Sequence, residues 1–465
     1  MSTLSLADFA KAARSTWRGP ETDLGAPFRP STDSRTIALG EVFVALRGPS
    51  FDGNAFAKAA LARGCRALVL DDTAAVPDPS PVPYMLVTDA KAAYIAGAAA
   101  ARRASDAQVV GITGSNGKTT TKAMATQLVG LRFHTLATPQ NENNELGVAK
   151  ICYLLGDDVD VAIVEMGARH PGEIAQLVEI AAPDVGVLTN VGEAHLEYFE
   201  DREDLARTKF ALFAGDARAV CNAGDEWSRM LAAEEGIDKD ALWIRLAGDH
   251  AVAGRTLEAS QPKDGHVEVT YGALHAWVEW HLAGEHHLRD ALLAAGAAIM
   301  CGVSFEAAAA GFGALHLPEG RFELHALPSG ATCVYDAYNA NPTSVAHALL
   351  AFADIPAQRR FAVLGSMAEL GPEVEAMHRA TGAAAARASL DALYCGGPYA
   401  RALIEGARKA GMPEASVRQY ESNSEIAAVL ANTLRSGDAV LLKGSRVQRM
   451  EEILQALLAG EKRAS

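Results

Sequence analysis

The stretch VVGITGSNGKTTTKAMATQLV, residues Val109–Val129, limits the possible folds of this chain more than any other. It opens with the β-branched run Val109–Thr113, which is typical of a buried strand. After a glycine-containing turn, Met124, Leu128 and Leu131 follow at the spacing i, i+4, i+7 of a helix. A strand, a glycine turn and a helix in this order predict an α/β protein with a largely parallel sheet.

The turn itself has the composition of a phosphate-binding loop. Its glycines can adopt positive φ, so backbone N–H groups can approach an anion, and the N-terminus of the following helix favours negative charge. Lys118 is placed to reach the β- and γ-phosphates of a nucleotide, and Thr119 to give its hydroxyl to Mg²⁺. The predicted ATP-binding loop comprises Gly114, Ser115, Asn116, Gly117, Lys118, Thr119 and Thr120.

The loop departs from a strict P-loop at one position. A strict P-loop has a glycine six positions before its lysine, and here that position is Ile112. The simpler interpretation is a glycine turn between a strand and a helix, with Lys118 in solvent. The strand before the turn, the helix after it and the lysine–threonine pair occur together, and this combination favours nucleotide binding.

Strand-like runs alternate with helical patterns for most of the chain length, which is typical of α/β architecture with parallel sheets. Besides the run before the glycine loop, they lie at Val42–Leu46, Ala67–Leu70, Val161–Met166, Val185–Val191, Phe361–Gly365 and Ala439–Gly444. The alternation predicts that the carboxyl ends of several strands share one edge of a sheet.

Two breaks in the pattern predict three domains. The proline-rich stretch AVPDPSPVPY (Ala75–Tyr84) precedes a helix that leads into the glycine loop. The second break lies at Leu315–Glu323, where a helical stretch ends and a new strand begins. The predicted domains are 1–83, 84–314 and 315–465. Strand-like alternation at Ala251–Trp280 predicts a small β excursion in the middle domain.

Composition excludes several classes of protein. There are 42 Lys and Arg against 57 Asp and Glu, which argues against a broad nucleic-acid surface but not against one phosphorylated small molecule. The six cysteines form no C-x-x-C pair, as expected of buried thiols in a reducing cytoplasm. Neither a signal peptide nor a membrane span is apparent. We expect a cytoplasmic protein and, since nothing calls for an obligate assembly, a monomer.

Two residues at or after strand ends are candidates for a metal site, and a lysine lies in the helix that follows them. Glu165 ends an apolar strand, the position where a carboxylate holds the metal in P-loop proteins. His195 follows another strand end, and Lys209 lies in a helix. Singly, each has a plainer interpretation: an exposed acid, a structural histidine and a solvated lysine. Together, Glu165 and His195 predict a metal site between neighbouring strands.

Polar residues in three loops are candidates for substrate contacts. The stretch TPQNENNELGVAK offers Asn141 and Asn144, whose amides suit a sugar or phosphate edge. The other candidates, from YDAYNANPTS and LLKGSR, are Asp336, Tyr338, Asn339, Asn341, Lys443 and Arg446. The plain interpretation of YDAYNANPTS is a strand-to-helix turn with asparagine caps. The plain interpretation of the other two stretches is a loop.

Taken together, the motifs resemble the Mur ligase family of ATP-dependent amide-forming ligases. The motifs, in the order of that family, are TDSRTIALGEVFVALRGPSFDGNAF, GSNGKTTTK, QNENNELGV, VEMGARHPGEI, LTNVGEAHLE, GRFE, DAYNANPTS, VLGSMAELG and LLKGSR. The resemblance covers nearly the whole chain, and the short glycine loop is the form this family uses. The segments DAYNANP and MAELG favour the branch that adds D-alanyl-D-alanine to UDP-N-acetylmuramoyl-tripeptide, a step of peptidoglycan precursor synthesis.

The resemblance implies an N-terminal domain for the UDP-linked substrate, a central ATPase domain with a mainly parallel sheet and a C-terminal domain with a doubly wound sheet. It implies ATP with two Mg²⁺ ions, and an acyl-phosphate intermediate. Lys118, His195 and Lys209 would be catalytic, and Lys209 would be carbamylated. Metal ligands would be Thr119, Glu165, His195 and Lys209. Nucleotide contacts from the third domain would be Arg321, Asp336 and Asn339. Substrate contacts would be Ser34, Arg35, Asp52, Asn141, Asn144, Tyr338, Asn341, Lys443 and Arg446.

Three departures from the family pattern concern the nucleotide side. His287 and Asp290 stand where asparagines are common, and Ala211 stands where a glutamate is common after the modified lysine. Two other functions stay open at this point. One is a related ligase with another acceptor, such as a sibling Mur ligase or a folylpolyglutamate-synthetase-like enzyme. The other is a nucleotide-gated switch without synthesis, against which the paired metal-site residues and the third-domain residues argue.

Overall fold

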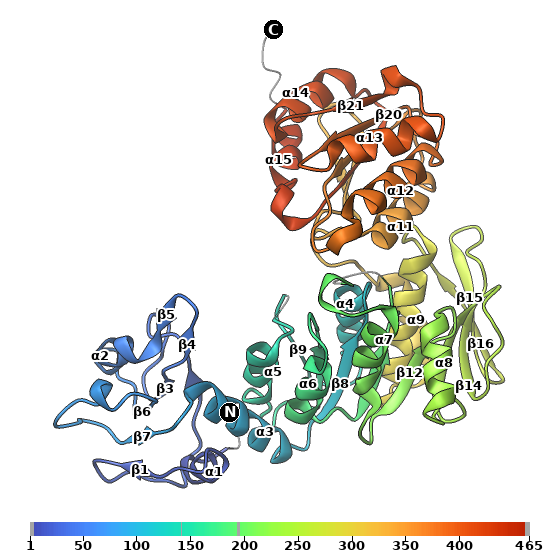
Figure 1. Ribbon diagram of the computed structural model, residues 1–465. Helices are drawn as coiled ribbons and strands as arrows, with labels where there is room; N and C mark the ends of the chain where they lie inside the picture. The colour runs from blue at the N-terminus through green and yellow to red at the C-terminus, as the bar shows by residue number, and fades with distance from the viewer. Residues whose placement is uncertain (1–3, 141, 193–195, 461–465) are drawn as a thin grey trace.

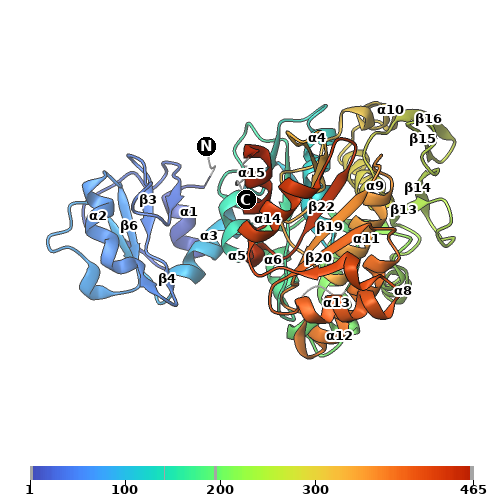
Figure 2. The same ribbon diagram turned by 90° about the horizontal axis from the view of Figure 1, so that it is seen from above.

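The computed structural model describes residues 4–140, 142–192 and 196–460. The chain forms three consecutive α/β units (Figure 1). The N-terminal unit, drawn in blue, joins the middle unit through α3 (Ala90–Arg103), and the C-terminal unit, in orange and red, stands over the middle unit. Seen from above, the N-terminal unit projects to one side (Figure 2). The predicted three-part α/β architecture is confirmed.

The N-terminal unit is built on a five-stranded sheet in the order β1-β7-β6-β3-β2. Its strands are β1 (Trp17–Arg18), β2 (Pro30–Ser31), β3 (Val42–Val44), β6 (Ala67–Leu70) and β7 (Tyr84–Leu86). Around the sheet lie α1 (Leu6–Ala12), α2 (Ala57–Ala62) and the hairpin of β4 (Arg47–Gly48) and β5 (Phe51–Asp52).

The sheet of the first unit extends a few residues beyond the predicted boundary at residue 83. The strand β7 begins at Tyr84 and pairs in parallel with β6, so the first unit extends at least to Leu86. The proline-rich stretch is therefore a loop between two neighbouring strands rather than a linker between units. A three-residue strand is too short to show the alternation that would have marked it in the sequence.

The middle unit contains a nine-stranded sheet in the order β16-β15-β14-β13-β12-β11-β8-β10-β9. The parallel strands are β8 (Gln108–Thr113), β9 (Thr135–Ala137), β10 (Val161–Glu165), β11 (Val185–Leu188), β12 (Arg218–Asn222), β13 (Leu242–Leu246) and β14 (Arg255–Ala259). The antiparallel strands are β15 (His266–Tyr271) and β16 (Leu274–Glu279). Both the mainly parallel sheet and the β excursion are confirmed, and the ends of β8, β10 and β11 meet at one edge.

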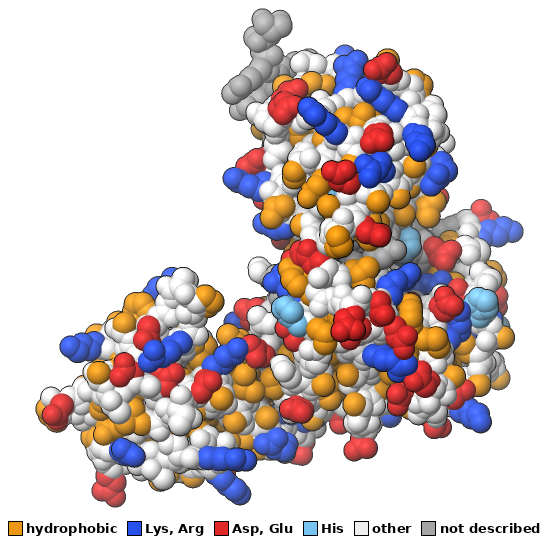
Figure 3. All heavy atoms as spheres, viewed as in Figure 1, with side chains coloured by type: hydrophobic (Ala, Val, Ile, Leu, Met, Phe, Trp, Pro, Cys, Tyr) orange, Lys and Arg blue, Asp and Glu red, His pale blue; other side chains and the backbone are white. Residues whose placement is uncertain are grey.

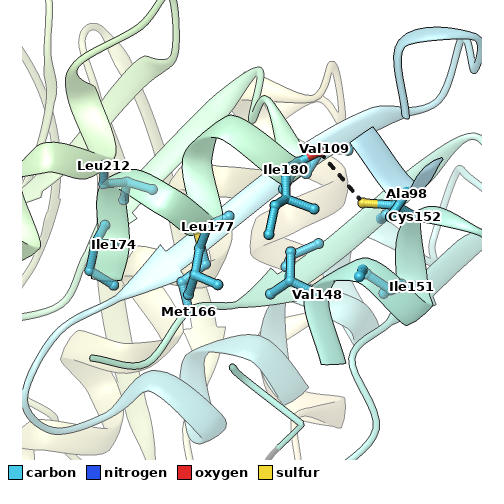
Figure 4. Close-up of a cluster of buried hydrophobic side chains, with 14 of the residues drawn as sticks. Ala98, Val109, Val148, Ile151, Cys152, Met166, Ile174, Leu177, Ile180 and Leu212 are labelled. Carbon is cyan, nitrogen blue, oxygen red and sulfur yellow. Dashed lines mark hydrogen bonds between the residues drawn. The ribbon is translucent and has the colours of Figure 1, made fainter. Parts of the chain in front are cut away.

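Helices cover both faces of this sheet. One face carries α4 (Lys118–Val129), α9 (Glu285–Met300) and α10 (Phe305–Ala310). The other carries α3, α5 (Glu145–Cys152), α6 (Glu173–Ala181), α7 (Arg202–Phe210) and α8 (Glu226–Glu234). The face under α4, α9 and α10 forms a first hydrophobic core, and the opposite face forms a second one. Because side chains alternate along a strand, Val110 and Ile112 pack into the first core and Val109 packs into the second. Figure 4 shows part of the second core, where Val148 and Leu177 pack beneath the sheet.

The C-terminal unit has a six-stranded sheet in the order β17-β18-β22-β19-β20-β21. The strands are β17 (Glu323–Ala326), β18 (Thr332–Tyr335), β19 (Arg360–Gly365), β20 (Ala392–Gly396), β21 (Val417–Gln419) and β22 (Ala439–Lys443). One face packs against α11 (Pro342–Ala353), α12 (Val374–Ala386) and α13 (Ala400–Lys409), the other against α14 (Asn423–Thr433) and α15 (Glu451–Ala459). Only β17 is antiparallel, so the doubly wound sheet is confirmed.

The surface and the cysteines agree with the composition. On the face shown in Figure 3, basic side chains are scattered among acidic ones and form no broad basic surface. All six cysteines are buried free thiols, as predicted. Among the described residues, no helix has the length and apolar character needed to cross a bilayer.

Candidate active site

A cleft of about 650 Å³ lies between the middle and C-terminal units. The middle unit contributes the glycine loop, the start of α5 and the residues after β10 to its walls. The C-terminal unit contributes one arginine and the loop before α11. The predicted site residues that line the cleft are Ser115, Asn116, Gly117, Lys118, Thr119, Asn144, Glu165, Arg321, Tyr338, Asn339 and Asn341.

The glycine loop follows β8 and is held by the residues after β11. The Ser115 amide donates to Asn190 O at 2.9 Å, and the Asn116 amide to Asn190 Oδ1 at 3.1 Å. A Cβ on Gly114 would lie 1.9 Å from Thr189 Oγ1, so only glycine lets the loop approach β11 this closely. The roles of Thr189 and Asn190 in holding the loop were not predicted, because these residues follow a strand that lies about 75 residues further along the chain.

Gly117 starts the helix that follows the loop. Its φ of +81° is a left-handed conformation, and an added Cβ would lie 2.4 Å from Asp290 Oδ1. The helix α4 begins at Lys118, as predicted, so its first amides face the cleft. Ser115 Oγ and Asn116 Nδ2 are buried without a hydrogen-bond partner among the described residues. Such unpaired donors beside a helix N-terminus suit the oxygens of a phosphate.

The ammonium of Lys118 folds back over the loop. Its Nζ donates to Gly114 O at 2.7 Å and to Ser115 O at 3.2 Å. Burial lowers the pKa of Lys118 and the charge of Arg321 adds to this, while Glu165 acts in the opposite direction. Thr119 lines the cleft beside it, whereas Thr120 is buried and does not line the cleft.

Glu165 ends β10, only 2% exposed, and reaches the cleft wall. Its Oε1 accepts from Asn143 Nδ2 at 2.9 Å, and its Oε2 lies 3.2 Å from Lys122 Nζ. Burial raises the pKa of Glu165, but the charges of Lys122 and Lys118 and the hydrogen bonds outweigh it, so the pKa is lowered and the group is a carboxylate. Lys122 follows Lys118 by one helical turn, a spacing that could have identified it in the sequence.

Lys209 lies near the end of α7 and is 1% exposed. Its Nζ donates to Gly114 O at 3.3 Å, so the predicted reactive lysine does lie beside the glycine loop. Burial, together with the charge of Lys118, lowers the pKa of Lys209 well below its ordinary value. His195 and Asn141, two further predicted site residues, lie outside the described residues.

The C-terminal unit places an arginine over the loop. Arg321 Nη2 donates to Thr119 Oγ1 at 3.5 Å, and its guanidinium lies 4.3 Å from the centre of the Tyr338 ring. This stacking fixes the plane of the guanidinium toward the start of α4. Asn339 lines the same wall, and Asn341 caps α11.

Three other residues predicted for the C-terminal unit do not line the cleft. Lys443 Nζ lies 2.6 Å from Asp336 Oδ2 and also donates to Asp336 O and Asn339 O, so this pair is buried beneath the loop. Burial lowers the pKa of Lys443, and Asp336 opposes the shift. Arg446 is exposed and lies 3.6 Å from Glu451. The Lys443–Asp336 pair supports the loop before α11 from below.

The predicted substrate residues of the N-terminal unit lie on a different unit from the cleft (Figure 1). Ser34 is buried, Arg35 pairs with Asp33 at 2.7 Å in solvent, and Asp52 caps the turn that follows it through a bond from the Asn54 amide. Their roles as substrate contacts stay predictions.

Near the N-terminal unit, a second cavity of about 350 Å³ is lined by Arg47, Asp71, Thr88, Asp89 and Lys91. Lys91, at the start of α3, forms an ion pair with Glu145, the first residue of α5. This pair connects the start of α3 with a wall of the cleft between the middle and C-terminal units. None of the five lining residues was predicted as a site residue.

The three departures from the family pattern have definite places. His287 is buried, and its Nδ1 lies 2.6 Å from Ala283 O. Asp290 Oδ1 accepts from Thr121 Oγ1 at 3.3 Å directly beneath Gly117, and burial raises its pKa to about 8. Ala211 follows α7 and begins a short 3-10 helix. Asp290 therefore lies against the phosphate loop, and its carboxyl keeps its proton to a higher pH than an ordinary aspartate does.

The sequence is similar to those of known proteins over most of its length. The chain matches the Mur ligase middle domain over residues 112–298 and the Mur ligase glutamate ligase domain over residues 320–446. It is 31% identical to the UDP-N-acetylmuramoyl-tripeptide–D-alanyl-D-alanine ligase of Escherichia coli, over 92% of this chain and 93% of that one. It is 33% identical to the Mycobacterium tuberculosis enzyme of the same name, over 92% of both chains.

Solved structures agree with the sequence comparison. A crystal structure of MurF from Acinetobacter baumannii superposes with a TM-score of 0.86 at 26% identity, covering 98% of both chains. MurF ligase from Thermotoga maritima, solved in complex with ADP, superposes with a TM-score of 0.79 at 28% identity. That superposition covers 94% of this chain and 99% of the other.

Proposed function

The chain belongs to the Mur ligase family, and from this premise we propose that it joins D-alanyl-D-alanine to UDP-N-acetylmuramoyl-tripeptide using ATP. The product would be a peptidoglycan precursor, formed with ADP and phosphate. The observation that carries the proposal is the likeness over nine-tenths of the chain to enzymes named for this reaction. The cleft supports it, because a phosphate loop and residues of the third unit face one another there.

The reaction needs an activated carboxyl group. A carboxylate oxygen is a poor leaving group, so the tripeptide carboxylate first attacks the γ-phosphorus of ATP, giving an acyl phosphate and ADP. The amine of D-alanyl-D-alanine then attacks the carbonyl carbon, the bond from that carbon to the phosphate oxygen breaks, and the amine proton passes to solvent. Such chemistry depends on positioning and charge neutralisation rather than on a protein nucleophile.

The chain supplies positive charge and donors at the loop. Lys118, the first amides of α4 and the guanidinium of Arg321 converge on the mouth of the loop, where the β- and γ-phosphates would lie. Tyr338 holds Arg321 in one plane, so the guanidinium need not reorganise as charge moves to the leaving phosphate. Closure of the C-terminal unit would exclude water from the acyl phosphate.

The residues at the cleft also fit Mg²⁺. Glu165 is a buried carboxylate at the cleft wall, with Oε2 3.2 Å from Lys122 Nζ, and Thr119 adds a hydroxyl at the cleft. Hard oxygen donors of this kind are what Mg²⁺ prefers, and the bound ion would neutralise phosphate charge. His195, the third predicted ligand, lies outside the described residues.

Lys209 fits the carbamylation that we propose for it. Carbamylation needs the neutral amine, and burial, together with the charge of Lys118, lowers the pKa of Lys209 well below its ordinary value, which favours that form. The carbamate would turn a buried cation into an anion beside the glycine loop, 3.3 Å from Gly114 O, where a second Mg²⁺ could balance its charge. A carbonate-dependent gain of activity that is lost in Lys209→Ala would support this role.

The names of the relatives favour the dipeptide acceptor over other amino acids. The relatives at 31% and 33% identity are named for D-alanyl-D-alanine. The likeness to Escherichia coli FolC, at 20% identity, supports the shared fold alone. We further propose a cytoplasmic monomer, because the six cysteines are free buried thiols and the units pack around the cleft within one chain.

A product assay tests the proposal. The protein is incubated with ATP, Mg²⁺ and UDP-N-acetylmuramoyl-tripeptide carrying either meso-diaminopimelate or lysine, together with D-alanyl-D-alanine, D-alanine or glutamate. Mass spectrometry should detect the dipeptide adduct with an equal amount of ADP. An adduct with glutamate instead of the dipeptide, or steady ATP hydrolysis with no acceptor present, would contradict the proposal.

A further inference from the structure

A side-chain hydrogen bond joins the phosphate loop to the C-terminal unit. Asn341 Nδ2 donates to Asn116 Oδ1 at 2.7 Å, although the two residues are 225 positions apart in the sequence. Asn116 belongs to the loop before α4, Asn341 is the N-cap of α11, and both line the cleft. The orientation of the C-terminal unit is therefore tied directly to the loop that would bind the phosphates.

The helix cap fixes which way both carboxamides point. Asn341 Oδ1 accepts from the Ser344 amide at 2.9 Å, so its Nδ2 must face the loop. A donor at that position requires the oxygen of Asn116 to face Asn341, which turns Asn116 Nδ2 the other way. That nitrogen is buried and has no hydrogen-bond partner within the described ranges. It is a donor that a phosphate oxygen in the loop would satisfy.

The backbone of Asn116 is held independently of its side chain. Its carbonyl oxygen accepts from Thr189 Oγ1 at 2.6 Å and from Asn190 Nδ2 at 3.0 Å. Its amide donates to Asn190 Oδ1 at 3.1 Å. The middle unit thus anchors the main chain at this point, and the carboxamide is the part of Asn116 that can respond to a ligand on one side and to the C-terminal unit on the other.

We propose that Asn116 and Asn341 are positioning residues that couple nucleotide binding to the seating of the C-terminal unit, an inference that rests on the proposed ATP-dependent function. A phosphate oxygen accepting from Asn116 Nδ2 polarises the carboxamide, which makes Oδ1 a stronger acceptor for Asn341. The start of α11 is then held against the loop, and with it Tyr338 and the guanidinium of Arg321. Asn341 acts through Asn116 rather than on a substrate.

The first test is a double-mutant cycle with Asn341→Ser and Asn116→Ala. Serine keeps an oxygen to cap α11 but is too short to reach Asn116, so the bridge is lost and the cap remains. Each single variant should lower kcat about fivefold, the typical worth of one hydrogen bond, and the double variant should be no slower than the slower single variant. The KM for D-alanyl-D-alanine should stay within about twofold, because the proposed coupling acts on the phosphate loop rather than on the dipeptide.

The matched control removes a helix cap elsewhere in the same unit. Ser422 caps α14, its Oγ accepting from the Glu425 amide at 3.2 Å, far from the loop in the sequence and on the opposite face of the sheet. Ser422→Ala should lower the melting temperature but leave kcat unchanged. We call the proposed coupling through Asn116 and Asn341 the relay. Effects that multiply in the double variant, or a tenfold rise of the dipeptide KM in Asn341→Ser alone, would refute the relay.

A binding measurement separates the relay from the reaction itself. With ADP alone, hydrogen exchange at the amides of Ser344 and Val345 should slow in the wild type, because α11 is held more firmly, and should not slow in either variant. This readout needs no turnover, so a wild type that makes no dipeptide product would refute the proposed function without touching the relay. Equal ADP-induced protection in the wild type and in Asn341→Ser would refute the relay.

Discussion

Replacing Asp290 with asparagine should stabilise the protein, and the gain should grow as the pH rises. Asp290 is buried in α9 and accepts a hydrogen bond from Thr121 Oγ1 at 3.3 Å. Burial raises its pKa from 3.8 to about 8, against the smaller opposing effects of the Thr121 bond and the charges of Arg321 and Arg289. The folded protein therefore keeps a proton on this carboxyl at pH values where the unfolded chain has lost it.

The sign and size follow from proton linkage. Between the unfolded and folded pKa values the folded state binds more protons, so the stability contributed by Asp290 is largest below about pH 4 and is lost as the pH rises toward 8. Each pH unit in this window costs at most about 1.4 kcal/mol. Asparagine has nearly the same shape, keeps an oxygen for Thr121 and does not titrate. Its advantage over Asp290 should therefore grow by about 2–3 kcal/mol between about pH 5 and about pH 7.

Scanning calorimetry at these two pH values measures the difference. For a unit of this size the change corresponds to about 5–10 °C in the melting temperature of the transition that includes the middle unit. Asp249→Asn is the matched control, because burial raises the pKa of Asp249 but the hydrogen bonds and charge of Arg289 outweigh it and lower the pKa. Its effect should be destabilising and equal at both pH values. A stability gain for Asp290→Asn that does not change with pH would refute the reasoning.

Three further substitutions test the cleft. Gly117→Ala should weaken ADP binding by about 5- to 150-fold in titration calorimetry, because the new Cβ would lie 2.4 Å from Asp290 Oδ1. Gly172→Ala, with a similar φ of +83° but nothing within 4 Å of the new Cβ, should leave the affinity unchanged, and equal losses would contradict the steric argument. Lys122→Met leaves Glu165 buried without the cation 3.2 Å away, so unfolding should cost about 3–5 kcal/mol less at neutral pH; an unaltered melting temperature would show that the pair is not a net stabiliser. Tyr338→Leu should lower kcat about 3- to 30-fold and Tyr338→Phe much less, because the ring face holds Arg321; equal losses in both variants would assign the role to the hydroxyl instead.

The local parts of the site were predictable because their causes are local. A β-branched run, a glycine at positive φ and apolar residues at helical spacing lie within twenty-one residues, and they place β8, the loop and the start of α4 correctly. Glu165 could be found because the last residue of a buried parallel strand must reach the sheet edge. The doubly wound C-terminal sheet was implied by the resemblance to a known family, whereas the alternation of strands and helices predicted only an α/β chain with largely parallel sheets.

The side-chain contacts between distant parts of the chain could not be predicted, because the sequence around one partner holds no signal that identifies the other. Lys443 has the sequence context of a loop-facing cation, yet the fold buries it against Asp336, 107 residues away. Asn341 has the sequence context of a helix N-cap, and it does cap α11. Its hydrogen bond to Asn116 forms only because the C-terminal unit lies over the loop. The short strand β7 escaped notice because three residues are too few to show a period.

The most direct measurement of the central claim follows one oxygen atom. UDP-N-acetylmuramoyl-tripeptide labelled with oxygen-18 in its reacting carboxylate is incubated with ATP, Mg²⁺ and D-alanyl-D-alanine, and the released phosphate is analysed by mass spectrometry. If ATP activates the carboxyl as an acyl phosphate in the cleft at Lys118, each phosphate should carry one labelled oxygen, and Lys118→Ala should release none. Amide product accompanied by unlabelled phosphate, or product formed by Lys118→Ala at the wild-type rate, would contradict the account.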